Sequence, residues 1–446
     1  MNEQKKDLKQ FLLTADLQEI KEVEEYLHPV DILDALHRSN DEEAEIILSR
    51  LSDETVADVL DEEDDEDIYS FLKKLSIPRQ NEVLEEMSSD ERADFVRALD
   101  EDESKDVMSK LNTEDKKEVT ELLQYEPDTA GGLMAVEVIT IYENRTVLKT
   151  LEYLQKTDPE AESAYYLFVT DRQKVLKGVI SLRDLVTSSF DTLISEITNP
   201  NVVSVHTDDD QEKVAQEFEK YGYMALPVVD SGNHLKGIIT VDDVLDIIQE
   251  ETTEDIHQMA GLSKEEKVDD SLPEAMHSRL PWLIINLATA VLAAICVAEF
   301  SDTISAVVAL AAINPIIAGM GGNAGTQSLT LIVRGIALGE LTGENAKKIF
   351  LKEVGVGLFS GIIIGIILAI GCYFVYGNMY LGLVAFLAIV GNMLIATISG
   401  YAVPVILQKL HIDPALASTV FVTTCTDCCG FLLFLGLATV FLPLLV

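Results

Sequence analysis

The sequence predicts a multi-domain protein made of an all-α acidic region, an α/β region, an acidic linking helix and five transmembrane helices. Three observations support this prediction. Acidic residues gather in the first part of the chain, the middle contains an internal repeat, and the last part contains long apolar stretches. The expected boundaries are residues 1–130, 131–250, 251–278 and 279–446.

The charge of the chain is distributed very unevenly. Of its 76 acidic residues eight lie in residues 272–446, together with six of its 33 basic residues, so nearly all of the net charge of −43 precedes residue 272. Such an excess argues against nucleic acid as a partner and would repel an anionic surface, but it attracts cations. From charge alone, the simpler alternative stays open that acidity only keeps the region soluble.

Residues 1–130 predict an array of short helices that forms an all-α N-terminal domain. Amphipathic stretches begin at cap-like residues, as in SDETVADVL at Ser52 and SDERADFVRAL at Ser89. The acidic run DEEDDEDIYS at Asp61 resembles a calcium-binding loop, but it lacks the glycine that an EF-hand needs at its sixth position. We interpret this run as a solvated acidic turn.

Residues 131–250 contain a repeat with an offset of 59 residues. LFVTDRQKVLKGVISLRDLV, which starts at Leu167, aligns with LPVVDSGNHLKGIITVDDVL, which starts at Leu226. Each copy predicts a strand, a turn, a second strand and then Ser/Thr-x-x-Asp at the start of a helix. This region resembles a tandem pair of CBS domains. The alternative is a purely structural repeat.

The resemblance to CBS pairs implies a groove that binds an adenine nucleotide, with ATP as the expected regulatory ligand. An aspartate would meet the ribose hydroxyls and an aromatic ring would stack on the base. The same residue types also cap helices and fill cores, so this alternative stays open. The candidate residues are Tyr166, Arg183, Asp184 and Tyr223.

The last part of the chain predicts five membrane spans, at about residues 281–300, 303–334, 354–376, 380–407 and 415–443. Lysine and arginine occur between the second and third stretches and between the fourth and fifth, whereas the other loops have none. This pattern places the N-terminus in the cytoplasm and the chain in the lipid bilayer of the cell (inner) membrane. The N-terminus does not resemble a signal peptide.

The second apolar stretch contains the run NPIIAGMGGNAGTQSLT at residues 314–330. We expect Pro315 and the glycines to break this helix, and the freed carbonyl groups, with oxygens of Asn314, Asn323 and Gln327, suit a hard cation. Close packing of helices through small residues is the alternative explanation.

Asp427 lies midway along the last apolar stretch, where a carboxylate is costly and indicates function. Thr423 precedes it by four residues and Thr419 by eight, so one face of the predicted helix is polar. We expect this face to line an ion path. The alternative is a carboxylate paired with a base inside the membrane.

Cysteines flank this aspartate. Cys425, Cys428 and Cys429 have spacing that could hold a soft metal ion, but two thiols one helical turn apart make only half of such a site. We therefore favour packing as their role.

Taken together, the order of domains, the GMGGNAGTQS loop and the Thr-x-x-x-Asp helix resemble the MgtE family of magnesium channels. The resemblance implies a homodimer with a pore on its two-fold axis, where Asp427, Thr423 and Asn323 meet Mg²⁺. It also implies uptake of Mg²⁺ for magnesium homeostasis, with cytosolic Mg²⁺ closing the pore through the acidic domains. The matching regulatory positions are Glu212, Asp243, Asp246, Glu251, Glu254 and Asp255.

Two departures from the family pattern keep other functions open. Gly222 stands where some relatives have an acidic ligand, and Thr419 where some have asparagine, so a broader channel for Mn²⁺, Co²⁺ or Ni²⁺ is one alternative. A non-conducting, membrane-anchored nucleotide sensor is another. A carboxylate protease would need a second aspartate at the same depth, and the chain has no Walker A loop, so we do not expect an enzyme.

Overall fold

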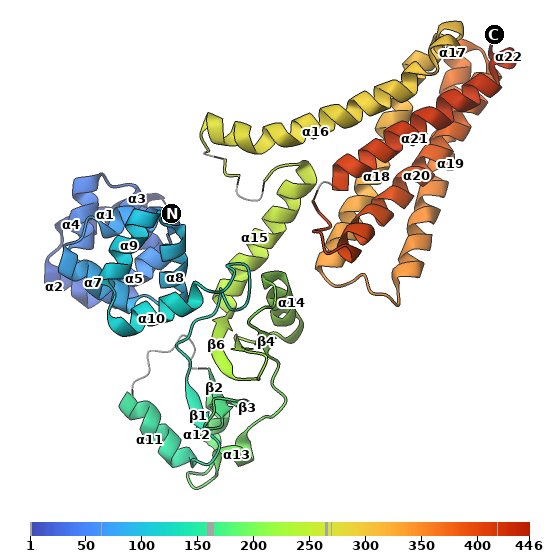
Figure 1. Cartoon of the computed structure of the whole chain (residues 1–446). Helices are drawn as coiled ribbons and strands as arrows, with labels where there is room; N and C mark the ends of the chain where they lie inside the picture. The colour runs from blue at the N-terminus through green and yellow to red at the C-terminus, as the bar shows by residue number, and fades with distance from the viewer. Residues whose placement is uncertain (1, 64, 158–164, 264–265, 269, 417) are drawn as a thin grey trace. The chain divides into compact units, whose positions relative to one another are not determined.

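The computed structural model describes residues 2–63, 65–157, 165–263, 266–268, 270–416 and 418–446 (Figure 1). The chain forms two compact units that divide after Ile247. The first, the soluble unit, contains the N-terminal helices and the repeated α/β modules. The second, the membrane unit, contains the long apolar helices.

The N-terminal region is a set of short helices, as predicted. Side-chain caps define several of their starts: Ser88 and Glu91 form a reciprocal capping box at one helix, and Asn40 and Glu43 do so at another. The buried apolar side chains of these helices, such as Phe95 and Leu60, form one core. The helices are α1 (Asn2–Thr14), α2 (Leu17–Val23), η1 (Glu24–Tyr26), α3 (Pro29–His37), α4 (Asp41–Leu48), α5 (Asp53–Asp61), α6 (Asp65–Leu72), α7 (Ile77–Glu86), α8 (Ser89–Ala98), α9 (Glu101–Lys110) and α10 (Thr113–Leu122).

The repeated region forms two modules with the same sheet. In each, the first strand is parallel to the second and the second is antiparallel to the third, in the orders β1-β2-β3 and β4-β5-β6. This confirms the repeat expected from the sequence. The elements are β1 (Thr140–Tyr142), α11 (Val147–Thr157), β2 (Tyr166–Thr170), β3 (Leu176–Ser181), α12 (Leu182–Thr187), α13 (Ile194–Ile197), β4 (Val205–His206), α14 (Gln211–Tyr221), β5 (Ala225–Val229) and β6 (Leu235–Thr240).

The two modules are joined through equivalent turns. Lys174 and Asn233, which are 59 residues apart, both have left-handed backbone, with φ of 61° and 60°. The Asn233 carbonyl accepts from the amide of Leu176 at 3.0 Å, and the Lys174 carbonyl accepts from the amide of Leu235 at 2.9 Å. The sequence repeat therefore produces a pair related by an approximate two-fold axis.

The linking helix differs from the prediction of residues 251–278. Helix α15 (Val241–Ala260) begins directly after the last strand of the second module and ends at Gly261, whose φ of 76° favours glycine. The next helix, α16 (Leu272–Ala298), begins with Pro273 in its first turn. The described residues of the predicted segment thus include the second half of one helix and the start of another.

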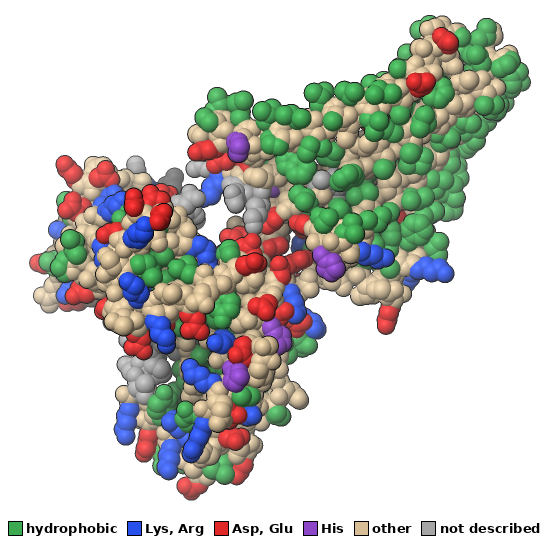
Figure 2. Space-filling view, in the orientation of Figure 1, with side chains coloured by type: hydrophobic (Ala, Val, Ile, Leu, Met, Phe, Trp, Pro, Cys, Tyr) green, Lys and Arg blue, Asp and Glu red, His purple; other side chains and the backbone are tan. Residues whose placement is uncertain are grey.

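The membrane unit contains long apolar helices. Among the described residues, α16, α19, α20 and the Thr419–Val440 part of α21 are long and apolar enough to cross a membrane. Helix α18 is 29 residues long but more polar, so four to five apolar helices form this unit. Figure 2 shows hydrophobic side chains over much of its visible face. The remaining elements are α17 (Ser301–Ala306), α18 (Ala309–Ala337), α19 (Ala346–Tyr376), α20 (Met379–Lys409), α21 (Ser418–Val440) and α22 (Leu442–Leu445).

The prediction of a broken second span is wrong. Helix α18 continues through Pro315 and the glycine cluster without interruption. A Cβ atom on Gly321 would lie 2.2 Å from Nδ2 of Asn392, and one on Gly325 would lie 2.5 Å from Cγ1 of Val422. The glycines therefore permit close packing of α18 on α20 and α21, which was the alternative explanation.

Candidate functional site

Asp427 lies in the middle of α21 and is half-buried. Within the described part of the chain, its carboxylate forms no hydrogen bond or ion pair. The alternative of an intramembrane base paired with this group therefore has no support among those residues. An ionised carboxylate at this depth needs a cation or water as its partner.

Threonine hydroxyl groups line α21 before Asp427. The hydroxyl of Thr423 donates to the carbonyl oxygens of Thr419 at 2.8 Å and Val420 at 3.1 Å, so its oxygen retains a lone pair. Thr419 donates to the Met259 carbonyl at 2.6 Å. The start of α21 is thus hydrogen-bonded to the end of α15.

Helix α18 has a polar face that the described part of this chain leaves exposed. Asn323, Thr326, Gln327 and Thr330 are exposed, while the opposite face packs on α20 and α21. Such side chains are unfavourable in contact with lipid. They indicate contact with water or with a second protein surface. Among the described residues, no hydrogen bond connects Asn323 with Asp427.

A second group of charges lies where α15 meets the membrane helices. Burial raises the pKa of Asp255 to about 6, with a further contribution from the negative charge of Asp413, while Arg334 opposes the shift. The carboxylate of Glu254, the neighbouring residue, accepts a hydrogen bond from Gln258. The structure thus brings Asp255 close to an acidic residue that the sequence did not single out.

A third group of carboxylates lies in the soluble unit. Burial, with the proximity and negative charge of Asp61 at the end of α5 and the charge of Asp90, raises the pKa of Glu91 of α8 well above its usual range. Burial, supplemented by the charges of Asp242 and Asp61, raises the pKa of Asp243, against hydrogen bonds from Thr240.

The same group of carboxylates also includes Glu62, which follows α5, and Asp246 in the second turn of α15. Burial raises the pKa of Glu62, with added contributions from Asp61 and Asp246. The structure thus brings Asp243 and Asp246 together with acidic residues of the N-terminal helices. We call Asp61, Glu62, Asp90, Glu91, Asp243 and Asp246 the acidic cluster.

The other predicted ligands are spread more widely. Glu212 lies in the first turn of α14, where its amide donates to the capping side chain of Asp210 at 2.9 Å, and Glu251 lies along α15. Among the described residues, no three acidic, histidine or cysteine side chains converge closely enough to hold a metal ion as they stand. The carboxylates would have to approach one another around a bound ion.

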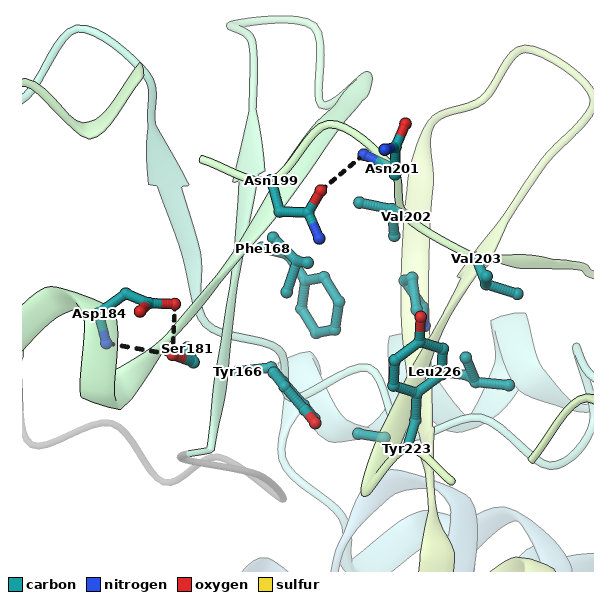
Figure 3. A pocket seen from close by; sticks show the side chains of 13 residues that line it. Tyr166, Phe168, Ser181, Asp184, Asn199, Asn201, Val202, Val203, Tyr223 and Leu226 are labelled. Atoms are coloured by element: carbon teal, nitrogen blue, oxygen red, sulfur yellow. Dashed lines mark hydrogen bonds between the residues drawn. The ribbon is translucent and has the colours of Figure 1, made fainter. Parts of the chain in front are cut away.

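A cavity of about 140 Å³ lies between the two α/β modules (Figure 3). Three of the four predicted nucleotide residues line it: Tyr166, Asp184 and Tyr223. The rings of the two tyrosines meet edge to face with centroids 6.5 Å apart. Arg183 is exposed and is not among the lining residues.

Polar groups of the cavity lie at its edge. The Asp184 carboxylate accepts a hydrogen bond from the Ser181 hydroxyl at 2.6 Å, and the Asp184 amide donates to that hydroxyl at 3.1 Å. This is a helix cap whose aspartate retains oxygens for a ligand. Asn199 and Asn201 also line the cavity, and the sequence analysis did not single them out.

Sequence patterns could have found some of the missed carboxylates. Asp61 and Glu62 belong to the acidic run interpreted as a solvated turn, of which residue 64 lies outside the described residues. Asp90 and Glu91 lie in a capping motif that was noticed only as a helix start. Nothing local to Asp413 distinguishes it, because its proximity to Asp255 depends on the packing of α15.

Comparisons with known proteins agree with these observations. Residues 314–437 match the model "Divalent cation transporter", residues 27–128 match "MgtE intracellular N domain", and residues 130–191 and 194–250 match "CBS domain". The chain is 40% identical over 327 residues to "Magnesium transporter MgtE" of Thermus thermophilus, covering 73% of this chain and 72% of that one. It is 39% identical to the protein of the same name from Enterococcus faecalis, over 73% of this chain and 72% of that one.

A solved structure is similar to the soluble part. The cytosolic domain of the Mg²⁺ channel MgtE in complex with ATP matches 52% of this chain and 95% of its own length, with 40% identity and a TM-score of 0.50. The matched models cover all three types of domain in their expected order, and the matched relatives are similar over most of their length. The chain therefore belongs to the MgtE family of magnesium transporters.

Proposed function

We propose that the protein is a Mg²⁺-selective channel that works as a homodimer in the cell membrane and closes when cytosolic Mg²⁺ is high. The observation that carries this proposal is the carboxylate of Asp427, held midway along an apolar helix without a hydrogen-bond or ion-pair partner among the described residues. Mg²⁺ retains its water and is bound through one or two carboxylates, so two copies of Asp427 on a two-fold axis suit a hydrated ion.

The uncovered polar face of α18 supports a dimer. Asn323 and Gln327 are exposed in one chain, and a second copy would shield them from lipid and leave them beside a water-filled path. Transport would need no coupled energy source such as ATP hydrolysis. An inward-negative potential of about 100 mV favours entry of a divalent ion by about 4.6 kcal/mol.

The acidic cluster supports closure by cytosolic Mg²⁺. Its carboxylates repel one another, so they separate when the ion is scarce and approach when Mg²⁺ binds among them. Asp255 and Asp413 offer a similar pair beside the membrane helices. The hydrogen bond from Thr419 to Met259 provides a direct connection between α15 and the helix of Asp427.

ATP is the proposed regulatory ligand of the cavity between the modules. Tyr166 and Tyr223 supply flat faces for adenine, and Asp184 supplies an acceptor for ribose hydroxyl groups. A similar soluble domain was solved in complex with ATP, which supports this proposal. Calorimetric titration of ATP should show binding that Tyr166→Ala and Tyr223→Ala weaken, whereas equal binding by these variants would exclude the cavity.

Uptake of Mg²⁺ into proteoliposomes tests the channel. We expect the wild type to take up Mg²⁺ down an electrical gradient and Asp427→Ala to lose this uptake. Asp302→Ala is a matched control, because Asp302 is an exposed carboxylate of the same unit at the start of the short helix α17. Equal uptake by wild type and Asp427→Ala would remove Asp427 from the ion path.

A further inference from the structure

Helix α19 packs on the rest of the membrane unit through one face only. In its most apolar stretch of 18 residues 17% are buried in the described structure, against 56% in α20. The packed face is made of small residues, because a Cβ atom on Gly357, Gly361 or Gly365 would lie 3.0 Å or less from an atom of α20. The opposite face of α19 is therefore available to another molecule.

This opposite face carries a row of large apolar side chains. They recur at intervals of three and four residues, so they project from one side of the helix. All of them are exposed. We call these residues the α19 stripe: Val356, Phe359, Ile363, Ile366 and Ile370.

Two lysines extend the α19 stripe towards the start of the helix. Lys348 and Lys352 precede Val356 by eight and four residues, and both are exposed. Side chains four residues apart are neighbours on a helix, so both ammonium groups can reach one anion. Lys347 projects about 100° away from Lys348. Figure 2 shows basic side chains where α19 begins, beside the hydrophobic surface.

These lysines differ from basic residues at the ends of other membrane helices. Arg279 of α16 forms an ion pair with Glu266. Arg334 of α18 lies close enough to Asp255 to lower its pKa. Among the described residues, Lys348 forms no ion pair. Its charge is therefore available to an anion that does not belong to this chain.

The charge of Lys352 is only partly balanced. Its Nζ atom lies 3.7 Å from Oε1 of Glu353, which is beyond hydrogen-bonding distance, and its side chain is 62% exposed. The other oxygen of this buried carboxylate accepts a hydrogen bond from the Ser328 hydroxyl at 2.7 Å. Glu353 is thus directed into the protein, while the ammonium group of Lys352 stays outside.

We propose that the α19 stripe, with Lys348 and Lys352, binds an anionic phospholipid in the leaflet on the side where α19 begins. The headgroup phosphate lies between the two ammonium groups, which attract anionic lipid. One leaflet of the hydrocarbon core is about 15 Å thick, or about ten helical residues. The acyl chains therefore cover the stripe from Val356 to Ile366. The site is independent of the proposed channel function.

Charge complementarity favours a lipid over a second copy of the chain as the occupant. Two copies inserted in the same orientation, with their stripes face to face, would bring Lys348 and Lys352 of both copies together. Like charges at this distance repel one another. An anionic headgroup instead neutralises the same lysines.

Native mass spectrometry of the full chain in detergent tests the site, with phosphatidylglycerol and phosphatidylcholine of the same acyl chains. The wild type should bind phosphatidylglycerol more tightly. Lys348→Gln and Lys352→Gln should each weaken this binding about fivefold, and together about thirtyfold, with little effect on phosphatidylcholine. Lys347→Gln is the control, because it removes the same charge beside the stripe. Equal losses for Lys347→Gln and Lys348→Gln would indicate diffuse attraction and overturn the proposal.

The same spectra distinguish the lipid from other occupants. Excess glycerol 3-phosphate, which has the phosphate without acyl chains, should not displace phosphatidylglycerol. Displacement at equal concentration would assign the binding to the phosphate alone and contradict a lipid site. Phosphatidylglycerol on the monomer but not on the dimer would show that a second copy covers the stripe, which would also contradict it.

Thermal unfolding in detergent provides a second measurement, because a ligand that binds only the folded chain raises the unfolding midpoint. Phosphatidylglycerol should raise the midpoint of the wild type more than phosphatidylcholine does. The variant with Lys348→Gln and Lys352→Gln should lose this difference. An equal difference in the wild type and the variant would overturn the proposal.

Discussion

The two units hold their carboxylates in opposite ways. In the soluble unit Asp61, Glu91 and Asp243 lie close together, and burial and mutual repulsion raise the pKa of Glu91 and Asp243. In the membrane unit Asp427 has no hydrogen-bond or ion-pair partner in the described part of the chain. A crowded group changes its arrangement when a cation neutralises it, whereas a lone carboxylate is available to each passing ion. The crowded carboxylates of the soluble unit are therefore suited to sensing a cation, and the isolated carboxylate of Asp427 is suited to ion passage.

The largest expected effect separates charge from shape at Asp427. Asp427→Asn keeps the size but removes the charge, and loss of one partner from a desolvated pair of opposite charges costs about 2–5 kcal/mol. Uptake of Mg²⁺ in proteoliposomes should therefore fall by about thirtyfold or more. Asp427→Glu, which keeps the charge, should retain more uptake than Asp427→Asn. Equal uptake by the two variants would show that the charge is not required.

The next effect concerns pH at Asp255, whose pKa of about 6 lies above its ordinary value of 3.8. The folded chain therefore holds a proton here below about pH 6, and a cation must displace it. At pH 5 about a tenth of this carboxyl group is ionised, so Mg²⁺ should bind about tenfold more weakly than at pH 7. Asp255→Asn should remove this dependence.

Fluorescence of Trp282 can measure this binding, because Trp282 is the sole tryptophan of the chain and lies beside Gly261 at the end of α15. Mg²⁺ titrations at pH 5 and pH 7 would give the two affinities. An affinity that is the same at both pH values in the wild type would show that Asp255 does not contribute to the site.

A third effect tests whether close packing holds the membrane unit, in contrast to the charges of the soluble unit. Gly321→Ala would place a methyl group against Asn392, and we expect a loss of stability of about 1–3 kcal/mol. Gly319→Ala on the same helix meets no atom within 4 Å and should have little effect. Thermal unfolding in detergent compares them, and equal midpoints would contradict the packing argument.

The smallest effect concerns repulsion in the acidic cluster. Asp61→Asn removes the negative charge that contributes to the raised pKa of Glu91, Asp243 and Glu62, so without Mg²⁺ we expect the soluble unit to unfold about 2–4 °C higher, which corresponds to about 1 kcal/mol. Added Mg²⁺ should then raise the midpoint less than in the wild type. Glu45→Gln, at an exposed position of α4, is the control. A lower midpoint for Asp61→Asn without Mg²⁺ would show that the charge of Asp61 is stabilising rather than repelled.

Much of the fold followed from local patterns. The offset of 59 residues predicted two equivalent modules, and the turns at Lys174 and Asn233 show that the equivalence extends to the backbone. The sequence could not show that α18 continues through Pro315, because a glycine cluster suits both a broken helix and a closely packed one. Close packing is indicated only by the positions of Asn392 and Val422, which lie on other helices.

The candidate sites were predicted in part. Asp427 was recognisable because a carboxylate in an apolar stretch is rare, and Tyr166, Asp184 and Tyr223 because the repeat aligned them. The proximity of Asp413 to Asp255 depends on tertiary packing, which leaves no periodic pattern in the sequence.

Currents through the purified protein in a planar bilayer test the central claim most directly, that crowded carboxylates control the passage at Asp427. Mg²⁺ is varied on the side of the soluble unit for the wild type and for a variant with Asp243→Asn and Asp255→Asn. The account predicts that the wild-type current falls as this Mg²⁺ rises and that the variant current persists. The same fall in both proteins, or no fall in either, would contradict it.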